Sequence, residues 1–263
     1  MRLLLALLML PVLVPALARA QAVRVPGPDG LMLNSELYLP HGAPTGPSIV
    51  ALHGCGGPLP RRDADWGRRL AAMGHVVLMP DSFGSRGLGS QCSSEVRAVR
   101  AGGLRRLDAL AALKWLAARP GSPPGGVVLL GWSDGGTTVL ATGRVAPDLP
   151  PGLIRGLVAF YPGCRVFAAQ ARYKPAVPLM ILIGEADDWT PAAPCRALAE
   201  KLPSTVTLVA YPGAYHEFDA PDGKLTLRTG LATPAHGRAH VGTNPAARAD
   251  ALRRVPAFIA ALP

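Results

Sequence analysis

The sequence predicts an α/β fold in which a mostly parallel, twisted sheet carries helices on both faces. Short apolar runs, such as residues 48–53 and 127–130, have the length and composition of buried strands. Stretches with apolar residues at helical spacing, such as 96–118, alternate with these runs, which is the pattern of a parallel sheet. With 49% hydrophobic and 17% charged residues the chain can form a large core, which excludes a disordered protein.

Turn signals bound the expected elements. The strand at 48–53 runs into Gly54-Cys55-Gly56-Gly57, and a strand at 75–79 is closed by Pro80-Asp81. The other expected strands are 31–39, 127–130, 157–160, 179–183 and 205–211, and the expected helices are 66–73, 96–118, 137–142, 192–202 and 246–262. Residues 218–244 are rich in Gly, Pro and Thr and are expected to be irregular, forming either a loop over the site or a surface segment.

Residues 1–20 are predicted to be a signal peptide and not part of the fold. Arg2 precedes an apolar run at 3–17 that is short for a membrane span and is interrupted by proline. Ala18-Arg19-Ala20 follows as a small-x-small cleavage site, with cleavage after Ala22 as the alternative. We therefore expect a secreted or periplasmic protein whose residues 21–263 form one domain, with no stable membrane span after cleavage.

The basic charge of the chain does not predict a nucleic-acid partner. There are 27 Lys and Arg against 17 Asp and Glu, a formal net charge of +10. The excess is spread along the chain, whereas a nucleic-acid binder more often has a basic stripe with interleaved aromatic residues. We therefore interpret the charge as a solvated surface, and the sequence leaves the oligomeric state open.

A nucleophile motif stands at the end of the strand at 127–130. Gly131-Trp132-Ser133-Asp134-Gly135 matches the pattern G-x-S-x-G, with an apolar strand before it and a helix after it. In that context the turn raises the serine hydroxyl clear of the sheet, and the backbone N–H of Asp134 at the helix N-terminus can stabilise an oxyanion. Ser133 is therefore the expected nucleophile, and the alternative is an ordinary Gly-rich turn between a strand and a helix.

An acid and a histidine follow in the order that this nucleophile requires. Asp187 comes just after the strand at 179–183 and is well placed to orient a histidine, although Glu185 and Asp188 are rivals on sequence alone. His216 follows the strand at 205–211, and the other histidines are less well placed. Ser133, Asp187 and His216 are thus the expected catalytic triad, and this chemistry needs no metal or organic cofactor.

Two further sets of residues are candidates for binding the substrate. The loop His53-Gly54-Cys55-Gly56-Gly57 lies where a second oxyanion donor is commonly found, and we expect the backbone N–H of Cys55 to be that donor. His53 itself is expected to pack the loop. Aromatic residues beside the motifs are expected either to line an acyl pocket or to pack in the core: Trp132, Trp189, Tyr161 and Tyr215.

At these motifs the chain resembles the dienelactone hydrolase family of α/β-hydrolases. The matching segments are HGCGG at 53–57, PDSFGSRG at 80–87, GWSDGG at 131–136, GEADDWTP at 184–191 and GAYHEFD at 213–219. The resemblance implies an α/β-hydrolase fold, a triad with Asp187 as its acid, and hydrolysis of a small-molecule ester or lactone through an acyl-enzyme. The namesake enzymes use a cysteine nucleophile where this chain has Ser133, and Arg86 is a candidate for their substrate-carboxylate arginine.

The four cysteines are expected to form two disulfides. An even number in an exported chain allows three pairings, and no spacing among them fits a structural zinc site. In the sheet that the family resemblance implies, Cys55 and Cys92 lie at the catalytic end, as do Cys164 and Cys195, so we expect these two pairs. Four buried free thiols are the alternative.

Three other functions use the same sequence features. A peptidase of the prolyl-oligopeptidase type shares the elbow and the residue order but usually carries a large extra domain. A non-catalytic binding protein on a hydrolase scaffold typically lacks one triad member, and this chain has all three candidates. An acyltransferase differs only in its acceptor and is not separated from a hydrolase by sequence.

Overall fold

An eight-stranded sheet forms the centre of the computed structural model, which describes residues 20–263 apart from 124 and 149. Its strand order is β1-β2-β4-β3-β5-β6-β7-β8. The strands are β1 (Ala20–Pro26), β2 (Met32–Tyr38), β3 (Ile49–Leu52), β4 (Val77–Pro80), β5 (Val127–Trp132), β6 (Ile154–Phe160), β7 (Leu179–Gly184) and β8 (Val206–Tyr211). Strands β3 to β8 pair in parallel, and β1 and β2 add an antiparallel edge. The predicted mostly parallel sheet is confirmed.

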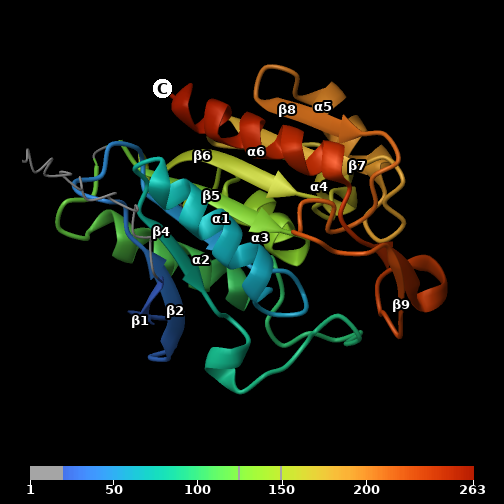
Figure 1. Ribbon diagram of the computed structural model, residues 1–263, viewed down its shortest axis with the longest axis horizontal. Coiled ribbons are helices and arrows are strands. Elements are labelled where there is room, and N and C mark those ends of the chain that lie inside the picture. Colours follow the sequence, from blue (N-terminus) through green and yellow to red (C-terminus); the bar gives the residue numbers. More distant parts are fainter. Residues whose placement is uncertain (1–19, 124, 149) are drawn as a thin grey trace, which may run out of the picture.

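Helices cover both faces of this sheet. They are α1 (Pro60–Ala72), α2 (Leu104–Ala117), α3 (Asp134–Thr142), α4 (Arg165–Ala169), α5 (Ala192–Lys201) and α6 (Pro245–Ala260). Figure 1 shows α1 and α6 on one face, where Arg248 of α6 donates to Asp65 of α1 at 2.6 Å, and α2 and α3 on the other. None of the described helices is long and apolar enough to cross a membrane.

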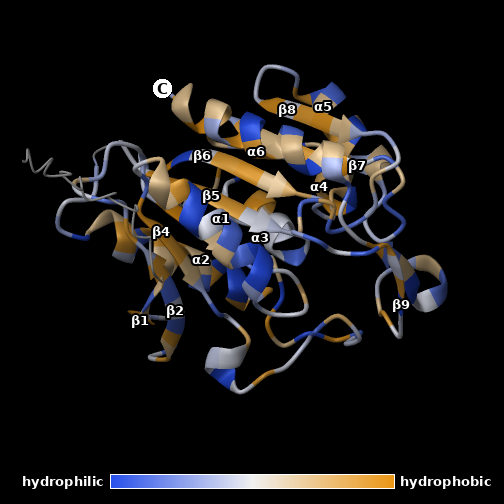
Figure 2. Cartoon of the chain, in the orientation of Figure 1, coloured by the Kyte–Doolittle hydropathy of each residue, from blue (hydrophilic) through white to orange (hydrophobic). Residues whose placement is uncertain are grey.

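The core lies between the sheet and the helices. Every residue of β3, β5 and β7 is buried, as expected for central parallel strands whose two faces are both covered. Figure 2 shows strongly hydrophobic strands, whereas the helices beside them carry both hydrophobic and hydrophilic residues. This rigid layer holds the loops that follow the strands in fixed positions.

One expected helix begins later than the sequence predicts. The apolar spacing of residues 96–118 indicates a helix over the whole stretch, but α2 starts at Leu104. Gly103 adopts a non-helical conformation before it, and Val96 is 90% exposed. The adjacent glycines at 102 and 103 favour chain reversal over helix, so the preceding residues form turns.

Several structural elements were not predicted, among them the short helix α4, strand β1 and a hairpin near the C-terminus. Strand β1 begins at Ala20, which is the last residue of the expected signal peptide, and the rest of that peptide lies outside the described residues. The stretch at 218–244 is only partly irregular, because it contains an antiparallel hairpin of β9 (Thr226–Thr229) and β10 (Arg238–Val241). This hairpin projects at one end of the molecule in Figure 1. Strands of four residues among Gly and Pro give little periodic signal.

Candidate active site

Three side chains meet at the carboxyl ends of β5, β7 and β8. Ser133 follows β5, Asp187 follows β7 and His216 follows β8. The Oγ of Ser133 lies 2.9 Å from Nε2 of His216, and Nδ1 of His216 lies 2.8 Å from Oδ2 of Asp187. Ser133 is 8% exposed, Asp187 4% and His216 1%. A hydroxyl, an imidazole and a carboxylate in this order have the geometry of a candidate Ser-His-Asp triad.

The turn that carries Ser133 is sterically constrained. Its backbone has φ 55° and ψ −116°, a left-handed conformation that is unfavourable for a residue other than glycine. A Cβ at Gly131 would lie 2.4 Å from the carbonyl oxygen of Gly135, and one at Gly135 would lie 2.1 Å from that of Leu52. Only glycine therefore fits at these two positions, and the turn points the serine hydroxyl outward at the start of α3.

The carboxylate of Asp187 is fixed by its own loop. Its Oδ1 accepts hydrogen bonds from the backbone N–H groups of Trp189 at 2.9 Å and Thr190 at 2.8 Å. The Thr190 hydroxyl, which has one proton to donate, lies 3.1 Å from Oδ2 of Asp187 and 3.0 Å from the carbonyl oxygen of Tyr161. Thr190 was not predicted as a site residue, although a Thr three residues after an Asp is a signal for a side-chain-stabilised turn.

The two acidic neighbours of Asp187 face other partners. Glu185 forms an ion pair with Arg196 of α5. Asp188 lies 2.7 Å from Nδ1 of His240 and accepts the backbone N–H of that residue at 2.8 Å. In the described structure only Asp187 of these three approaches the imidazole of His216.

Two aromatic rings pack against the imidazole of His216. The ring centres of Trp189 and Tyr161 lie 4.8 Å and 4.4 Å from the centre of the imidazole. Aromatic faces attract cations, so these rings are suited to an imidazole that becomes positively charged during a reaction. The packing also restricts rotation of the histidine side chain.

The two backbone N–H groups expected to bind an oxyanion face no acceptor among the residues that the structure describes. Within the described part of the chain, neither the N–H of Cys55 nor that of Asp134 donates a hydrogen bond. Asp134 is the first residue of α3, where the helix dipole favours negative charge. Both residues line the same cavity as Ser133. Free donors beside a nucleophile are able to stabilise an oxygen that becomes negative.

Two cavities open at Ser133. The first has a volume of about 250 Å³, and the second about 190 Å³. Cys55, Ser133 and Trp189 line both. The arginines that line them were not predicted, since no motif contains them: Arg97 and Arg165 in the first, and Arg62 and Arg228 in the second. No group of three or more metal-ligating side chains with suitable geometry occurs among the described residues.

Trp132 and Tyr161 pack in the core, which is the second of the two roles considered for them. Both are fully buried, and they donate hydrogen bonds to Asp219 at 2.8 Å and 2.7 Å. Asp219 is fully buried as well and accepts a third bond from Nε1 of Trp66 at 2.8 Å. Burial raises the pKa of Asp219, and burial followed by the charge of Asp219 raises the pKa of Tyr161. The cluster adjoins the site through Tyr161, whose ring packs against the imidazole of His216.

Tyr215 and Arg86 also lie away from the two cavities. The Tyr215 ring packs against His240, with 5.0 Å between the ring centres. The guanidinium of Arg86 makes two hydrogen bonds of 2.8 Å to the buried carboxylate of Asp108 and a third to the carbonyl oxygen of Ser82. The Arg86 guanidinium is therefore committed to Asp108, which corrects the expectation that it binds a substrate carboxylate.

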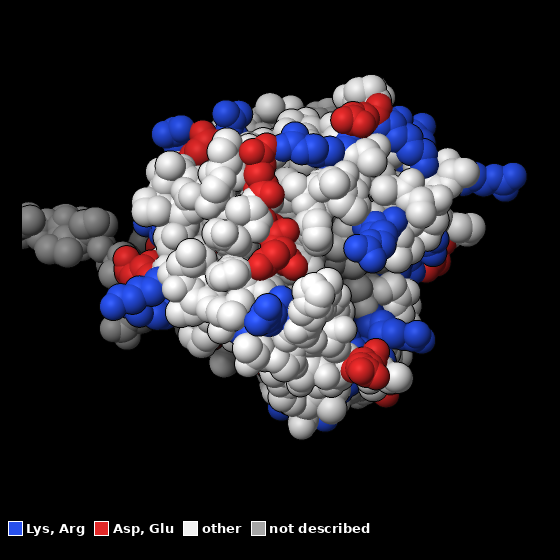
Figure 3. Space-filling view, turned by 90° about the vertical axis from the view of Figure 1, so that its right-hand side faces the viewer, with Lys and Arg blue, Asp and Glu red and all other residues white. Residues whose placement is uncertain are grey.

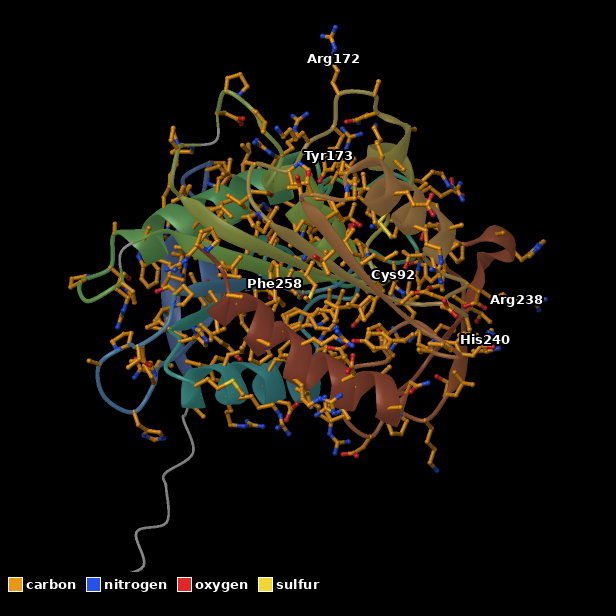
Figure 4. All side chains as sticks on the ribbon, turned by 90° about the horizontal axis from the view of Figure 1, so that it is seen from above. Cys92, Arg172, Tyr173, Arg238, His240 and Phe258 are labelled. Atoms are coloured by element: carbon orange, nitrogen blue, oxygen red, sulfur yellow. A yellow bond between two sulfur atoms is a disulfide. The ribbon has the colours of Figure 1, made fainter. Side chains whose placement is uncertain are left out.

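The structure contains both expected disulfides. Cys55 is bonded to Cys92, with Cα atoms 5.0 Å apart, and Cys164 is bonded to Cys195, with Cα atoms 5.1 Å apart. The first holds the loop after β3, which also accepts a hydrogen bond from Gln91 at 2.7 Å. The second joins the start of α4 to α5. Figure 4 shows Cys92 toward the interior, whereas Arg238 and His240 lie at the edge.

The segment at 218–244 completes one wall of the site. Thr233 accepts a hydrogen bond from Nε1 of Trp189 at 2.9 Å and lines the first cavity. Arg228 lines the second cavity and pairs with Glu217 at 2.8 Å. The N–H of Gly242 donates to the carbonyl oxygen of His216 at 3.0 Å. The segment therefore borders the site, and acidic and basic side chains are interspersed on this end of the molecule (Figure 3).

The dienelactone hydrolase family profile matches residues 33–262 of this sequence. The chain belongs to that family. A comparison with curated proteins finds no match. Among solved structures, a dienelactone hydrolase-like protein from Klebsiella pneumoniae is 18% identical with a TM-score of 0.70, and the match covers 92% of this chain and 98% of that one. Thermogutta terrifontis esterase 2, phosphonylated by cyclosarin, is 20% identical with a TM-score of 0.67, covering 94% and 95%.

A third similar structure is larger than this family member. Porphyromonas gingivalis dipeptidyl peptidase 4 is 18% identical with a TM-score of 0.60. The match covers 77% of this chain but only 33% of the peptidase. At such identities the three structures establish a shared α/β-hydrolase fold, and the family establishes a hydrolase.

Proposed function

We propose that this protein is a serine hydrolase that cleaves an ester or lactone of a small molecule. In this proposal Ser133 is the nucleophile, His216 is the general base and Asp187 orients the imidazole. The observation that carries it is the unbroken contact from Ser133 Oγ to His216 at 2.9 Å and from His216 to Asp187 at 2.8 Å. Membership of the dienelactone hydrolase family supports the same class of reaction.

The reaction proceeds through an acyl-enzyme. The Oγ of Ser133 attacks the carbonyl carbon while its proton passes to Nε2 of His216. The negative oxygen of the tetrahedral intermediate accepts hydrogen bonds from the N–H groups of Cys55 and Asp134. His216 then gives its proton to the departing oxygen as the C–O bond breaks. Water, deprotonated by His216, releases the acid and restores Ser133, and the Asp187 carboxylate stabilises the imidazolium in both steps.

The two cavities suit a substrate with two arms joined at the scissile carbonyl. They share Ser133 and Cys55, so the acyl part can occupy one cavity while the leaving group occupies the other. Their volumes of about 250 and 190 Å³ favour small arms over a polymer. Arg97 and Arg165 make the first cavity basic beside the carboxylate of Asp134.

Labelling by a fluorophosphonate probe tests the nucleophile directly. The wild-type protein is expected to form a stable adduct on Ser133, located by peptide mass spectrometry, and Ser133→Ala is expected to form none. The same variant should lose hydrolysis of p-nitrophenyl acetate by about 10⁴-fold or more while it stays folded, because the triad acts as a unit. Retention of a tenth of the activity by Ser133→Ala would falsify the assignment.

A peptidase is the second candidate within this chemistry. The dipeptidyl peptidase that shares the fold has a chain about three times the length matched here, which is why we rank the esterase first. Turnover of aminoacyl-p-nitroanilides at a higher kcat/KM than esters of the same acyl group would reverse that order. Transfer of the acyl group to an added alcohol in preference to water would indicate an acyltransferase. An unlabelled wild-type protein would indicate a binding protein.

We also propose that the protein is exported to the periplasm or secreted. Two disulfides are typical of an oxidising compartment, and residues 1–20 have the composition of a signal peptide. Cleavage after Ala20 keeps nearly all of β1, whereas cleavage after Ala22 shortens it further, so we favour the earlier site. The N-terminal residue of the protein recovered from the periplasm or medium, measured by intact mass, tests this; a full-length cytoplasmic form would contradict it.

A further inference from the structure

A buried guanidinium joins the two segments that carry the free N–H groups beside Ser133. Arg105 lies in the first turn of α2, and none of its side chain is exposed. Its Nη2 donates to the carbonyl oxygen of His53, at the end of β3, and its Nη1 donates to Oδ2 of Asp134, at the start of α3. The loop that begins at His53 carries the N–H of Cys55. One planar cation thus contacts both of the segments that carry the proposed oxyanion donors.

The same two segments are in direct backbone contact. A Cβ on Gly135 would lie 2.1 Å from the carbonyl oxygen of Leu52 and 2.5 Å from that of His53, so α3 begins immediately against the end of β3. The guanidinium of Arg105 also packs 4.9 Å from the ring centre of Phe83. Because a guanidinium is a rigid fork, its two hydrogen bonds fix the spacing of the groups that it joins.

The charge of Asp134 makes this contact important. The side chain of Asp134 is a carboxylate, and the N–H of the same residue would bind the oxyanion. The carboxylate repels the negative charge that forms on the oxyanion, and charges in a partly buried site interact strongly. Two guanidinium groups surround this carboxylate, because Arg97 donates to Oδ1 at 2.8 Å while Arg105 donates to Oδ2. The three side chains together carry one net positive charge. Arg97 and Asp134 are only 13% and 10% exposed, so solvent screens this cluster weakly.

We propose that Arg105 is the positioning residue of the oxyanion hole. It holds the N–H of Asp134 and the loop carrying the N–H of Cys55 at a fixed separation, and it makes the charge near the oxyanion positive. Arg105 is not among the described residues that line either cavity at Ser133, so it acts through other groups. This inference rests on the proposed function and adds to it a residue outside the triad.

The chain offers a matched control on the same helix. Arg106 is also buried, but its guanidinium pairs with Asp148 and its Nε donates at 3.0 Å to the carbonyl oxygen of Ala141, near the far end of α3. Arg105→Met and Arg106→Met each remove one buried cation from α2. Both variants are therefore expected to lose stability, and only the first is expected to disturb the oxyanion donors.

The experiment compares kcat, KM and boronate inhibition in these variants. A phenylboronic acid becomes a tetrahedral anion when Ser133 adds to boron, so its affinity reports on the oxyanion site. For p-nitrophenyl acetate, Arg105→Met is expected to lower kcat by about 30-fold or more, in the direction seen when an oxyanion donor is lost, with KM changed less than about threefold. Boronate affinity should fall by a similar factor. Arg106→Met should keep both within about threefold of wild type.

The outcomes separate this inference from the proposed function. If the wild-type protein is active and kcat falls equally in Arg105→Met and Arg106→Met, the role of Arg105 is overturned but the proposed function stands. A raised KM with unchanged kcat in Arg105→Met would have the same meaning. A wild type that neither hydrolyses esters nor labels at Ser133 would overturn both. If Arg105→Met does not fold, Arg105→Lys retains the charge without the fork. It is expected to lower kcat by a smaller factor, with KM and circular dichroism unchanged, because only the spacing of the two donors is lost; an unchanged kcat would contradict the positioning role.

Discussion

The carboxylate of Asp188 faces His240, 2.7 Å away, although the adjacent Asp187 faces His216. Asp187→Asn is therefore expected to lower kcat for ester hydrolysis by about 10⁴-fold, because an amide favours the wrong histidine tautomer. Asp188→Asn is expected to change kcat less than about threefold, since it removes only an exposed contact. Steady-state kinetics of the two variants checks this. A severe loss in Asp188→Asn with a mild loss in Asp187→Asn would place the acid one residue later.

Thr190 is expected to assist Asp187 through its hydroxyl. Its Oγ1 lies 3.1 Å from Oδ2 of Asp187 and 3.2 Å from Nδ1 of His216. Thr190→Val keeps the shape of the side chain and removes the donor, so kcat should fall by about tenfold, which corresponds to one hydrogen bond to a charged group. Thr190→Ser restores a hydroxyl and should recover most of that loss. Equal activities of the Val and Ser variants would show that the hydroxyl has no such role.

The two disulfides are expected to differ in their effect on catalysis. Removing either should lower the free energy of unfolding by about 2–4 kcal/mol, mainly by freeing the unfolded chain. The pair Cys55→Ser and Cys92→Ser should also lower kcat by about tenfold, because Cys55 carries a proposed oxyanion donor. The pair Cys164→Ser and Cys195→Ser serves as the comparison. Urea unfolding and kinetics below each midpoint separate the two effects, and an equal drop in kcat for both pairs would contradict the prediction.

Stability is expected to fall on acidification through two buried histidines. Burial, and then the charge of Arg105, lowers the pKa of His53, and burial lowers the pKa of His75. In the unfolded chain both return to their ordinary value of 6.5, so below that pH the unfolded state binds more protons than the folded state. The free energy of unfolding should thus be constant above about pH 7 and decrease below pH 6.5, by up to about 1.4 kcal/mol per pH unit for each histidine.

Urea titrations between pH 5 and 8 measure this dependence. The slope of the free energy of unfolding against pH gives the number of protons taken up on unfolding. Below pH 6.5, His53→Gln and His75→Gln should each lower that number by about one, whatever their effect on stability at neutral pH. The exposed His236 provides the control, and His236→Gln is expected to keep the wild-type slope. A wild-type protein whose stability does not change between pH 7 and pH 5 would refute the assignment.

The motifs predicted the fold and the meeting of Ser133, Asp187 and His216 because both depend on local sequence. A buried parallel strand needs an apolar run, and an elbow needs Gly131 and Gly135, whose Cβ atoms would collide with backbone. The order of Ser133, Asp187 and His216 along successive strand ends then places them together. Local rules of this kind are read from a single sequence.

The surroundings of the triad were harder to predict because they depend on contacts distant in sequence. Trp132 was a pocket candidate since it adjoins the nucleophile, but its indole turns inward to Asp219, which is 87 residues away. Arg105 is 29 residues from Asp134, and its charge was interpreted, with that of the other basic residues, as part of a solvated surface. Side chains of successive residues can point to opposite sides of an element, so adjacency to a motif does not determine which side chain enters a cavity.

The two disulfides divide the chain into separate covalent loops. The loop closed by Cys55 and Cys92 ends before the one closed by Cys164 and Cys195 begins, and strand β5 with Ser133 lies in neither. The loops are therefore not interlocked, and a chain that emerges N-terminus first can oxidise the first pair before Cys164 appears. Each bond joins two cysteines that are consecutive along the sequence, so correct pairing needs no disulfide shuffling.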